Sequence, residues 1–498
     1  MILNEIKSQA LQVPERIALQ GEQTQLSYAE LASEITRWSS ALTAVTAQAS
    51  VALALDNSPA WILLDLAILA AGWTNVPIPA FFSATQKQHA VQNAAVSLIL
   101  TDLPTSWTAL FSQAETVAAW QVAGKTVTVL RVQASDRATP VAKITYTSGT
   151  TGAPKGVCLG EQQMWQVASS IRAMVQPGHD DCHFCVLPLA TLLENVAGVY
   201  ASLIAGTTVV VYRCEAVGFT GSQFDILKLY CGLQASQATT AILIPELLRA
   251  LVACLQAGQP ALAQLRFVAV GGAKVAAELL LQAHALGLPV YEGYGLSECA
   301  SVVTLNIPDA NQPGSIGQPL PHVQLRVDSQ GELWVKGAIY AGYMAADGTI
   351  SEPALDAEGY LPTGDLAYQD AEGRWILSGR KKNLFITSFG RNVSPEWVES
   401  TLMHQAGLLQ VCVFGEARPY NVAVVFPAPQ VSQAQVLQGI ARANQGLPDY
   451  AQVGDVIVVR QPFTPQNGQL TANGRLKRDV IAAAYAAEIN AIYEGISA

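Results

Sequence analysis

Charged residues are scarce in this sequence: 13% of its 498 residues are Asp, Glu, Lys or Arg, and the formal net charge is -10. No stretch gathers lysines and arginines into a basic stripe, although nucleic acids and acidic membrane surfaces both reward such clusters. Neither is therefore expected as the main partner. Half of the residues are apolar and the chain is too long for one average domain, which predicts roughly three structural units with room to share cores.

Signals for export and membrane insertion are also missing. The start, Met1 to Ser8, lacks the basic-then-apolar order of a signal peptide, so retention in the cytoplasm is expected. The longest charge-free apolar stretch, residues 195–212, is interrupted by Gly198, Gly206 and two threonines. It predicts a buried helix ending at Gly206 and then a strand at 209–212, and no integral membrane segment.

A disulfide framework is the third absence. The eight cysteines are scattered along the chain, which suits a reducing compartment. Residues 179–185 read His-Asp-Asp-Cys-His-Phe-Cys, a spacing that resembles metal sites. No second pair follows, and Cys185 continues into the apolar run 186–188. Packing is therefore the favoured interpretation, and zinc stays the alternative.

Short apolar runs alternate with helical stretches along much of the chain. Strands are predicted at 51–55, 75–78 and 97–100, and in a second series that begins at Ile144 and includes 209–212, 241–244 and 267–270. Residues 26–42 have helical spacing, with Ser27 able to cap the helix and Glu30 three residues on. The alternation predicts an α/β fold of two doubly wound units, with a ligand cleft at the carboxyl ends of their strands.

One run combines glycine, hydroxyl side chains and a lysine directly after an apolar segment. It reads Tyr146-Thr-Ser-Gly-Thr-Thr-Gly-Ala-Pro-Lys-Gly156. Glycines let successive N–H groups converge on an anion, hydroxyls donate further hydrogen bonds, and Lys155 adds a mobile cation. The run is not a Walker A loop, since no Gly-Lys-Ser/Thr is present. It predicts a phosphate-holding loop, with these residues expected at the nucleotide: Thr147, Ser148, Gly149, Thr150, Thr151 and Gly152.

The run resembles the phosphate loop of the adenylate-forming superfamily, which includes acyl-CoA synthetases, nonribosomal adenylation domains and beetle luciferases. Further family-like signatures follow in order to the C-terminus, and the chain looks most like long-chain fatty acyl-CoA synthetases. The resemblance implies a large N-terminal domain, residues 1–379, with two doubly wound α/β subdomains and a small barrel-like subdomain. It also implies a small mobile α+β C-terminal domain, residues 380–498.

Two predicted strands end in residues suited to a nucleotide. The run 268–273 ends in Gly271, Gly272 and Ala273, which would let a flat ring or a carbonyl lie against the backbone. The run 290–298 reads Val-Tyr-Glu-Gly-Tyr-Gly-Leu-Ser-Glu and resembles the family's Tyr-Gly-x-Thr/Ser-Glu motif. Roles are expected there for Tyr294 on adenine, Gly295 beside the nucleotide, Ser297 on the α-phosphate and Glu298 on Mg²⁺.

The ribose and the moving domain have candidates further on. Asp365, in Leu-Pro-Thr-Gly-Asp, matches the family's ribose-binding aspartate. A carboxylate suits this role because it accepts two hydrogen bonds from a vicinal diol. Arg380 is expected at ribose or phosphate, and Lys382 corresponds to the family's hinge. Gly390 falls where backbone passes close to the acceptor thiol. The segment 394–395, Ser-Pro, predicts a helix start.

Two departures from the family concern the acid and the C-terminal cation. Thr191 stands where fatty-acid-activating relatives usually have histidine, and no carboxylate lies at 188–193 to hold an amine, so an acid without an α-amine is favoured. Relatives usually carry a lysine near the C-terminus that bridges carboxylate and α-phosphate. Here Arg475 holds that position, with Lys477 two residues on. Arg475 is predicted as the catalytic cation and Lys477 as a supporting one.

The expected function is ATP-dependent activation of a small-molecule carboxylic acid through an acyl-adenylate, followed by transfer to CoA. Resemblance favours a fatty acid. The catalytic set is then Lys155, Ser297, Glu298, Arg475 and Lys477, with ATP, Mg²⁺ and CoA as reactants and cofactors. Two alternatives remain: a ligase that loads an acyl carrier protein or another acceptor, and a nucleotide-binding homologue with reduced catalysis.

Overall fold

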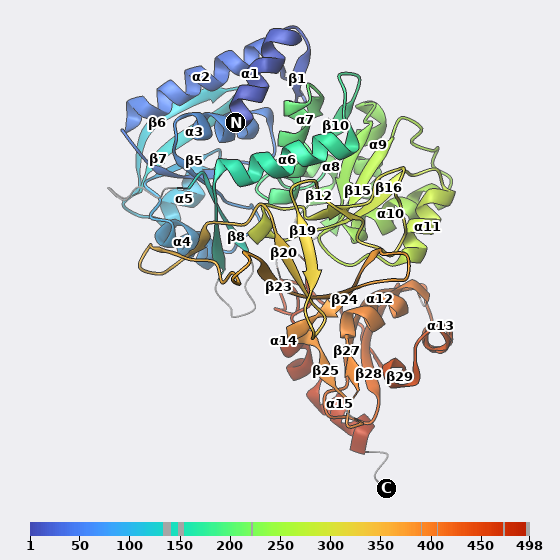
Figure 1. Ribbon diagram of the computed structural model, residues 1–498. Coiled ribbons are helices and arrows are strands. Elements are labelled where there is room, and N and C mark those ends of the chain that lie inside the picture. The colour runs from blue at the N-terminus through green and yellow to red at the C-terminus, as the bar shows by residue number, and fades with distance from the viewer. Residues whose placement is uncertain are drawn as a thin grey trace.

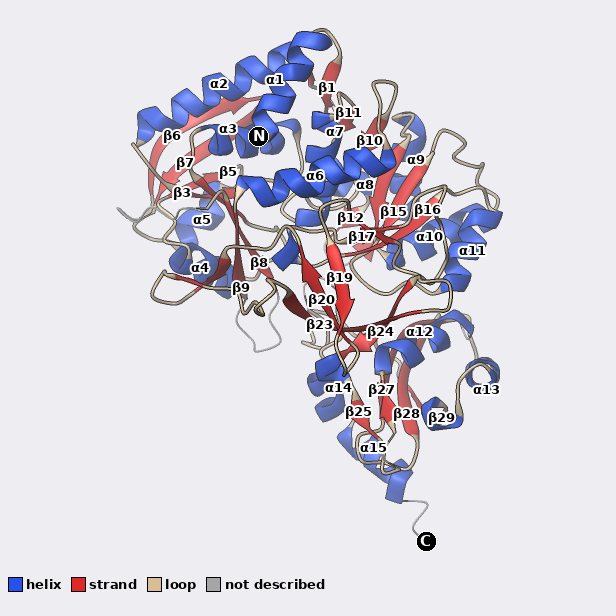
Figure 2. Cartoon of the chain, in the orientation of Figure 1, coloured by secondary structure: helices blue, strands red, loops and turns tan. Residues whose placement is uncertain are grey.

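The computed structural model describes residues 1–132, 141–147, 154–220, 223–389, 391–405, 407–471 and 474–494. Figure 1 shows a broad part, coloured blue to yellow, and below it a smaller orange-to-red part that holds the C-terminal segment. Figure 2 shows the strands gathered into separate sheets with helices packed around them. The α/β class predicted from the sequence is confirmed.

The first large sheet has nine strands in the order β22-β21-β9-β8-β4-β3-β5-β7-β6. Its central strands β8, β4, β3 and β5 are parallel, and the flanking strands pair antiparallel. The strands are β3 (Ser50–Ala54), β4 (Thr74–Pro77), β5 (Leu98–Thr101), β6 (Glu115–Val122), β7 (Lys125–Arg131), β8 (Lys143–Thr147), β9 (Lys155–Leu159), β21 (Gly342–Met344) and β22 (Ile350–Ser351).

The second large sheet also has nine strands, in the order β18-β17-β16-β15-β14-β10-β11-β1-β2. From β16 to β1 the pairing is parallel, which is the doubly wound arrangement expected from the alternation. The strands are β1 (Ile17–Gln20), β2 (Gln25–Ser27), β10 (Cys182–Phe184), β11 (Thr208–Val210), β14 (Thr240–Leu243), β15 (Phe267–Val270), β16 (Val290–Tyr294), β17 (Thr304–Leu305) and β18 (Gln318–Pro319).

Smaller sheets follow along the chain. A four-stranded antiparallel sheet forms the third unit, and a three-stranded sheet lies in the C-terminal part. The third unit contains β19 (Gln324–Val327), β20 (Glu332–Lys336), β23 (Leu361–Gln369) and β24 (Trp375–Arg380). The remaining strands are β12 (Phe219–Thr220), β13 (Gln223–Phe224), β25 (Phe385–Ile386), β26 (Asn392–Val393), β27 (Leu408–Phe414), β28 (Asn421–Pro427) and β29 (Val453–Val458).

Helices cover the sheets, and several begin at the caps that the sequence indicates. Ser27 and Glu30 form a reciprocal capping box at the start of α2. The α-helices are α1 (Ile2–Gln12), α2 (Tyr28–Val45), α3 (Pro59–Ala70), α4 (Ala84–Asn93), α5 (Pro104–Leu110), α6 (Glu161–Val175), α7 (Ala201–Ile204), α8 (Cys214–Val217), α9 (Ile226–Ala235), α10 (Pro245–Gln256), α11 (Ala277–Ala285), α12 (Pro395–Gln405), α13 (Gln433–Gln445), α14 (Arg478–Ala484) and α15 (Ala486–Glu494). Short helical turns are η2 (Ser297–Cys299), η3 (Lys381–Asn383) and η4 (Asp449–Ala451).

The buried helix predicted at 195–206 is present, but it begins earlier and its first part is a different type of helix. Residues 193–200 form a π-helix, η1 (Leu193–Tyr200), which continues into α7. Within the part of the chain that the structure describes, no helix is both long enough and apolar enough to cross a membrane.

A buried ion pair ties the first large sheet to η1. The Nζ atom of Lys143, at the start of β8, lies 2.9 Å from Asp65 Oδ1 on α3, and both side chains are almost completely buried. Tyr200 of η1 donates to Asp65 Oδ2 at 2.7 Å. Breaking such a pair leaves an uncompensated buried charge, so these contacts fix η1 against the strand that leads into the glycine-rich run.

Candidate functional site

The candidate site lies at the carboxyl ends of β15 and β16, where a parallel sheet is expected to hold its ligand. Gly271 and Gly272 follow β15, and Gly295 and Ser297 follow β16. All four border one cavity of about 220 Å³, whose wall is otherwise mainly apolar. Gly272 has a φ of 87°, a conformation that favours glycine, and its backbone is exposed. Ala273 is exposed beside it.

Asp365 stands at the centre of a hydrogen-bonded group on one side of the cavity. Its Oδ2 accepts from the Tyr294 hydroxyl at 2.7 Å, and its Oδ1 lies 2.9 Å from Arg380 Nε. Asp365 and Arg380 face each other across β23 and β24, so the strand pairing sets this contact. Burial and the neighbouring Asp365 raise the pKa of Tyr294, which keeps its hydroxyl a donor. Three predicted residues are thus brought together.

Glu298 lies in a second group with Lys155. The Tyr343 hydroxyl donates to Glu298 Oε1 at 2.6 Å, and Lys155 Nζ lies 5.1 Å from the centre of the Tyr343 ring. β21 pairs with β9, which places Tyr343 beside the strand that begins with Lys155. Among the described residues, Glu298 Oε2 has no hydrogen-bond partner. Thr147 pairs with Lys155 across the ends of β8 and β9.

Arg475 reaches the cavity from the C-terminal part of the chain. Its Nη2 donates to the Gly272 carbonyl oxygen at 3.3 Å, and its side chain borders the cavity. Arg475 lies in the electrostatic field of both Asp365 and Glu298, and its guanidinium stays protonated at neutral pH.

Backbone and side-chain contacts hold the segment that carries Arg475. Thr471 N donates to Arg475 O at 2.7 Å, and Lys477 N donates to Gln469 O at 2.8 Å, which makes a hairpin. Next to it, Arg478 donates from Nη2 to Glu399 Oε2 at 3.1 Å. This ion pair fixes the base of the hairpin against α12.

The remaining predicted residues either show no side-chain contact with the acidic groups or lie outside the described residues. Lys477 is exposed, and no side-chain contact of it is found among the described residues. Lys382 lies in η3 with an exposed surface; partial desolvation and the charges of Arg380 and Arg475 lower its pKa, and Asp365 and Glu396 oppose this shift. Gly390 and the loop residues Ser148, Gly149, Thr150, Thr151 and Gly152 lie outside the described residues.

The segment 187–195 forms the wall of the cavity on the η1 side. Thr191, Leu192 and Leu193 border the cavity, and the Thr191 hydroxyl donates to Pro188 O at 2.7 Å. Glu194 points away into a buried group, where its carboxylate accepts from Leu187 N at 2.7 Å and contacts His183 Nε2 at 2.8 Å. No carboxylate borders the cavity on this wall within the described chain.

The histidine and cysteine residues of the segment 179–185 make packing and hydrogen-bond contacts. His183, Cys185 and Glu194 lie within 4.8 Å of one another and are buried. Glu194 is already satisfied by two backbone N–H groups and His183, and the Cys182 thiol lies 3.5 Å from Ser236 O, away from this group. These contacts support the packing interpretation over zinc.

The comparison with known families decides the identity. Residues 6–344, more than half of the chain, match the family described as AMP-binding enzyme. The chain belongs to the AMP-binding enzyme family. Residues 382–497 match the AMP-binding enzyme C-terminal domain. The predicted resemblance to adenylate-forming enzymes and the predicted enzyme class, AMP-forming acid–thiol ligase, are confirmed.

Named relatives of this AMP-binding enzyme act on different acids. A long-chain-fatty-acid–CoA ligase of Mycobacterium bovis is 26% identical, over 95% of this chain and 93% of the relative. A 2-succinylbenzoate–CoA ligase of Enterococcus faecalis is 29% identical, over 61% of this chain and 63% of the relative. The two names belong to different classes of acid, a long-chain fatty acid and 2-succinylbenzoate.

Solved structures show the same fold. The anthranilate CoA ligase AuaEII in complex with anthranoyl-AMP superimposes with a TM-score of 0.83 at 17% identity, covering 97% of this chain and 96% of that one. The o-succinylbenzoate CoA synthetase of Bacillus subtilis in complex with ATP and magnesium gives 0.76 at 23% identity, covering 96% and 98%. The predicted fold class is confirmed.

The residues present in this AMP-binding enzyme fit a magnesium ion. Glu298 offers a carboxylate oxygen, Oε2, that no described residue occupies, while the Tyr343 hydroxyl orients the other oxygen. Hard oxygen donors of this kind are what Mg²⁺ prefers, and it is usually held by one or two carboxylates together with substrate phosphates.

Tyr343 is a site residue that the sequence did not predict. It follows Gly342 in the short run Ala-Gly-Tyr-Met, which carries no chemical signal by itself. Its role depends on the pairing of β21 with β9, two segments far apart in the chain. The available signal was a lone tyrosine after glycine on a short strand, and this alone could not have placed it beside Glu298.

Proposed function

We propose that this protein activates a carboxylic acid with ATP and transfers the acyl group to CoA. The acid's carboxylate oxygen attacks the α-phosphorus of ATP, the bond from that phosphorus to the bridging oxygen breaks, and pyrophosphate leaves. The thiol of CoA then attacks the acyl carbon, the thioester forms, and AMP leaves. Family membership supports the adenylate-forming chemistry, and the acid and the acceptor belong to this proposal.

One observation carries the proposal most directly: Arg475 meets Gly272 at the mouth of an apolar cavity, within the field of Asp365 and Glu298. A cation in that place would neutralise charge on the acid carboxylate and the α-phosphate as they approach. Asp365 and Tyr294 would hold the nucleoside, while Lys155 and the glycine-rich run would hold the leaving phosphates. Catalysis by alignment and charge neutralisation needs no covalent group from the protein.

Magnesium would be held by Glu298 together with phosphate oxygens. It would neutralise phosphate charge and polarise the phosphorus centre, which is the chemistry that a bound divalent cation supplies. Tyr343 supports this role because its hydrogen bond fixes the Glu298 carboxylate and leaves Oε2 available.

The acid is proposed to be aliphatic and to carry no second charge. Leu192, Leu193, Ile242 and Phe267 contribute apolar surface to the cavity, and His183 and Arg475 are the basic side chains that border it within the described chain. Both ring nitrogens of His183 are already engaged, by Glu194 Oε1 at 2.8 Å and by Thr240 Oγ1 at 3.0 Å. A remote carboxylate would therefore find no second uncommitted cation, and an amine would find no carboxylate. A fatty acid meets both conditions.

The C-terminal part, residues 380–498, is proposed to move between the two half-reactions. Its own buried clusters, around Val411 and around Phe463, support its independence as a packed unit. Lys382 in η3 is the proposed pivot, and rotation there would carry Gly390 toward the acyl-adenylate. Movements of this kind commonly separate chemical steps in enzymes.

Pyrophosphate release with a panel of acids, with and without CoA, tests the proposal. Release that requires a fatty acid, accompanied by acyl-CoA when CoA is added, is the expected result. Release without thioester formation, followed by acyl transfer to an acyl carrier protein, would favour the alternative acceptor. No release with any acid would favour a nucleotide-binding homologue with reduced catalysis.

A further inference from the structure

The cavity runs along β14 and β15, from the carboxyl ends of these strands to their amino ends. Gly271 and Gly272 border it at the carboxyl ends of the strands, and Thr240 and Phe267 border it at the amino ends. The path from Phe267 to Gly272 is five residue steps, or roughly 17 Å at about 3.3 Å per step. This wall therefore sets an upper limit of roughly 17 Å on the depth of the cavity below the place proposed for the acyl carbonyl.

Val175 and Pro177 close the cavity at its deep end. Val175 is the last residue of α6, and Gln176 leaves the helix with a left-handed φ of 49°. Val175 also borders a second hollow of about 400 Å³, to which Met174, Ile307 and Pro319 contribute. Val175 is thus shared by the walls of the acyl cavity and of an outer hollow.

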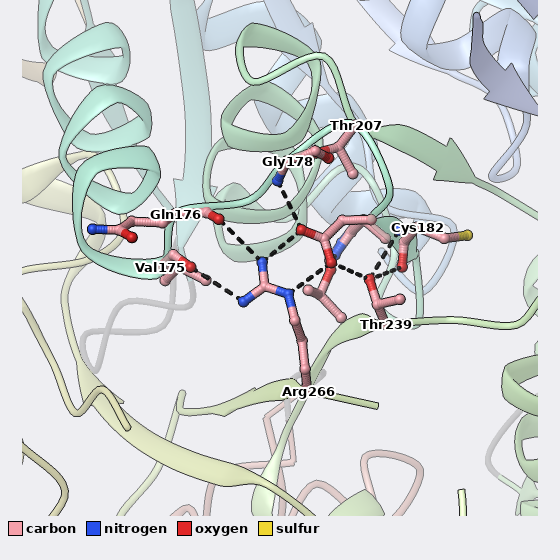
Figure 3. Close-up of polar contacts among 10 residues, drawn as sticks. Val175, Gln176, Gly178, Cys182, Thr207, Thr239 and Arg266 are labelled. Carbon is pink, nitrogen blue, oxygen red and sulfur yellow. Dashed lines mark hydrogen bonds and ion pairs between the residues drawn. The ribbon is translucent and has the colours of Figure 1, made fainter. Parts of the chain in front are cut away.

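An ion pair formed by Arg266 supports this wall, and Figure 3 shows the contacts of Arg266 with Val175 and Gln176. Arg266 donates from Nη1 to Val175 O at 3.2 Å and from Nη2 to Gln176 O at 3.4 Å. Its Nε and Nη2 each donate to Asp181, both at 2.7 Å. Asp181 in turn accepts from Gly178 N at 2.7 Å.

The same aspartate is tied to the sheet. The Thr239 hydroxyl donates to Asp181 Oδ1 at 2.8 Å, and Arg266 directly precedes Phe267 at the start of β15. Burial raises the pKa of Asp181, but hydrogen bonds from Arg266, Gly178 and Thr239 outweigh it and hold the pKa below its usual value. The turn at 175–178 is therefore held to the amino ends of the strands by a charged aspartate.

We propose that the Asp181–Arg266 ion pair determines acyl chain length by holding Val175 and Pro177 across the end of the cavity. A staggered alkyl chain with bonds of about 1.5 Å advances about 1.3 Å per carbon, so roughly 17 Å, less about 2 Å for the radius of the terminal methyl group, accepts about twelve carbons. Shorter acids leave apolar wall uncovered, and longer acids meet Val175. The preferred substrates are medium-chain fatty acids, an inference that rests on the proposed activation of a fatty acid.

Longer acids would fit if the wall moved, because Val175 also borders the outer hollow. Val175→Ala removes the barrier itself, and Val175→Phe should shorten the cavity. Arg266→Met removes the donors that hold the carbonyls of Val175 and Gln176 and keeps a long apolar stem. Arg266→Lys keeps the charge but loses the planar fork, so it should behave between wild type and Arg266→Met.

The test measures kcat/KM for pyrophosphate release with saturated acids from hexanoate to stearate, for the wild type and these variants. Wild type should prefer decanoate and laurate. Val175→Ala and Arg266→Met should raise the palmitate-to-decanoate ratio at least about tenfold, and Val175→Phe should move the optimum to shorter acids. Arg213→Met is the matched control, since it breaks an exposed ion pair with Glu22, at 2.8 Å, outside the cavity wall.

A wild-type enzyme that uses palmitate as well as decanoate would overturn the inference. So would an unchanged length profile in both Val175→Ala and Arg266→Met, or an equal shift in Arg213→Met. Complete inactivity of the wild type with every acid would instead contradict the proposed function, so the two failures are distinguishable. A thermal unfolding curve for each variant separates a shifted profile from partial unfolding.

Discussion

Arg475 Nη2 donates a hydrogen bond to the Gly272 carbonyl oxygen at 3.3 Å, which joins a C-terminal hairpin to the end of β15. The contact brings a cation to the place where a carboxylate and an α-phosphate are proposed to meet. Lys477, two residues further on, has no such contact among the described residues. Position therefore favours arginine as the cation in this chain.

We predict that Arg475→Ala reduces adenylate formation by about 10²-fold or more, the size expected when a preorganised positive group is removed. Arg475→Lys should keep part of the rate, and Lys477→Ala should stay near wild type. Pyrophosphate release without CoA measures this step. Loss of activity in the lysine variant alone would reverse the assignment, and no loss in either would remove the hairpin cation from adenylation.

Glu298→Ala should abolish Mg²⁺-dependent adenylation and leave the fold intact, because a metal-binding carboxylate is lost rather than core volume. Tyr343→Phe removes the hydrogen bond to Glu298 and should raise the Mg²⁺ concentration needed for half-maximal rate. Mg²⁺ titrations of pyrophosphate release check both, with Glu278→Ala on α11 as an exposed acidic control. Unchanged turnover in Glu298→Ala would remove its metal role.

Lys382→Pro should impair thioester formation more than adenylate formation, because proline fixes one backbone torsion at the proposed pivot. The two half-reactions are measured separately, as pyrophosphate release without CoA and as thioester formation from supplied acyl-adenylate. Lys477→Pro would remove a hydrogen bond of the hairpin and is therefore a poor control. Lys381→Pro, one residue before the pivot, is the closer control. Equal loss in both half-reactions would place the pivot elsewhere.

Glu292 should make stability depend on pH. Burial raises its pKa to about 8, against the opposing effects of the Val275 N–H and Lys274. The folded protein then holds a proton that the unfolded chain releases above its ordinary pKa of 4.5, so stability falls as pH rises from there toward 8. Glu292→Gln should unfold at a higher temperature than wild type at about pH 9 and at a similar temperature at about pH 5. The same difference at both values would exclude this titration.

The strand order along the chain was predictable because buried parallel strands read as short apolar runs between helices. The predictions at 51–55, 75–78 and 267–270 correspond to β3, β4 and β15 within one or two residues. The assignment of β1 and β2 to the second large sheet was not predictable, because strand partners depend on long-range packing rather than local pattern.

The candidate site likewise contains residues that the sequence predicted and residues that it did not. Asp365, Tyr294 and Arg380 carry recognisable local motifs, and pairing of β23 with β24 brings two of them together. Tyr343 and the pair Asp181–Arg266 carry no local signal, since their chemistry appears only when distant segments meet. The sequence also did not predict that η1 is a π-helix, because its apolar residues are compatible with an α-helix.

The central claim is that the reaction passes through an acyl-adenylate, and mass spectrometry of a CoA-free reaction with ATP, Mg²⁺ and decanoate tests it most directly. The account predicts decanoyl-AMP and pyrophosphate in equal amounts, and conversion of that adenylate to decanoyl-CoA and AMP when CoA is added. Formation of ADP and phosphate, or of acyl-CoA with no adenylate detectable in the wild type or in Lys382→Pro, would contradict it.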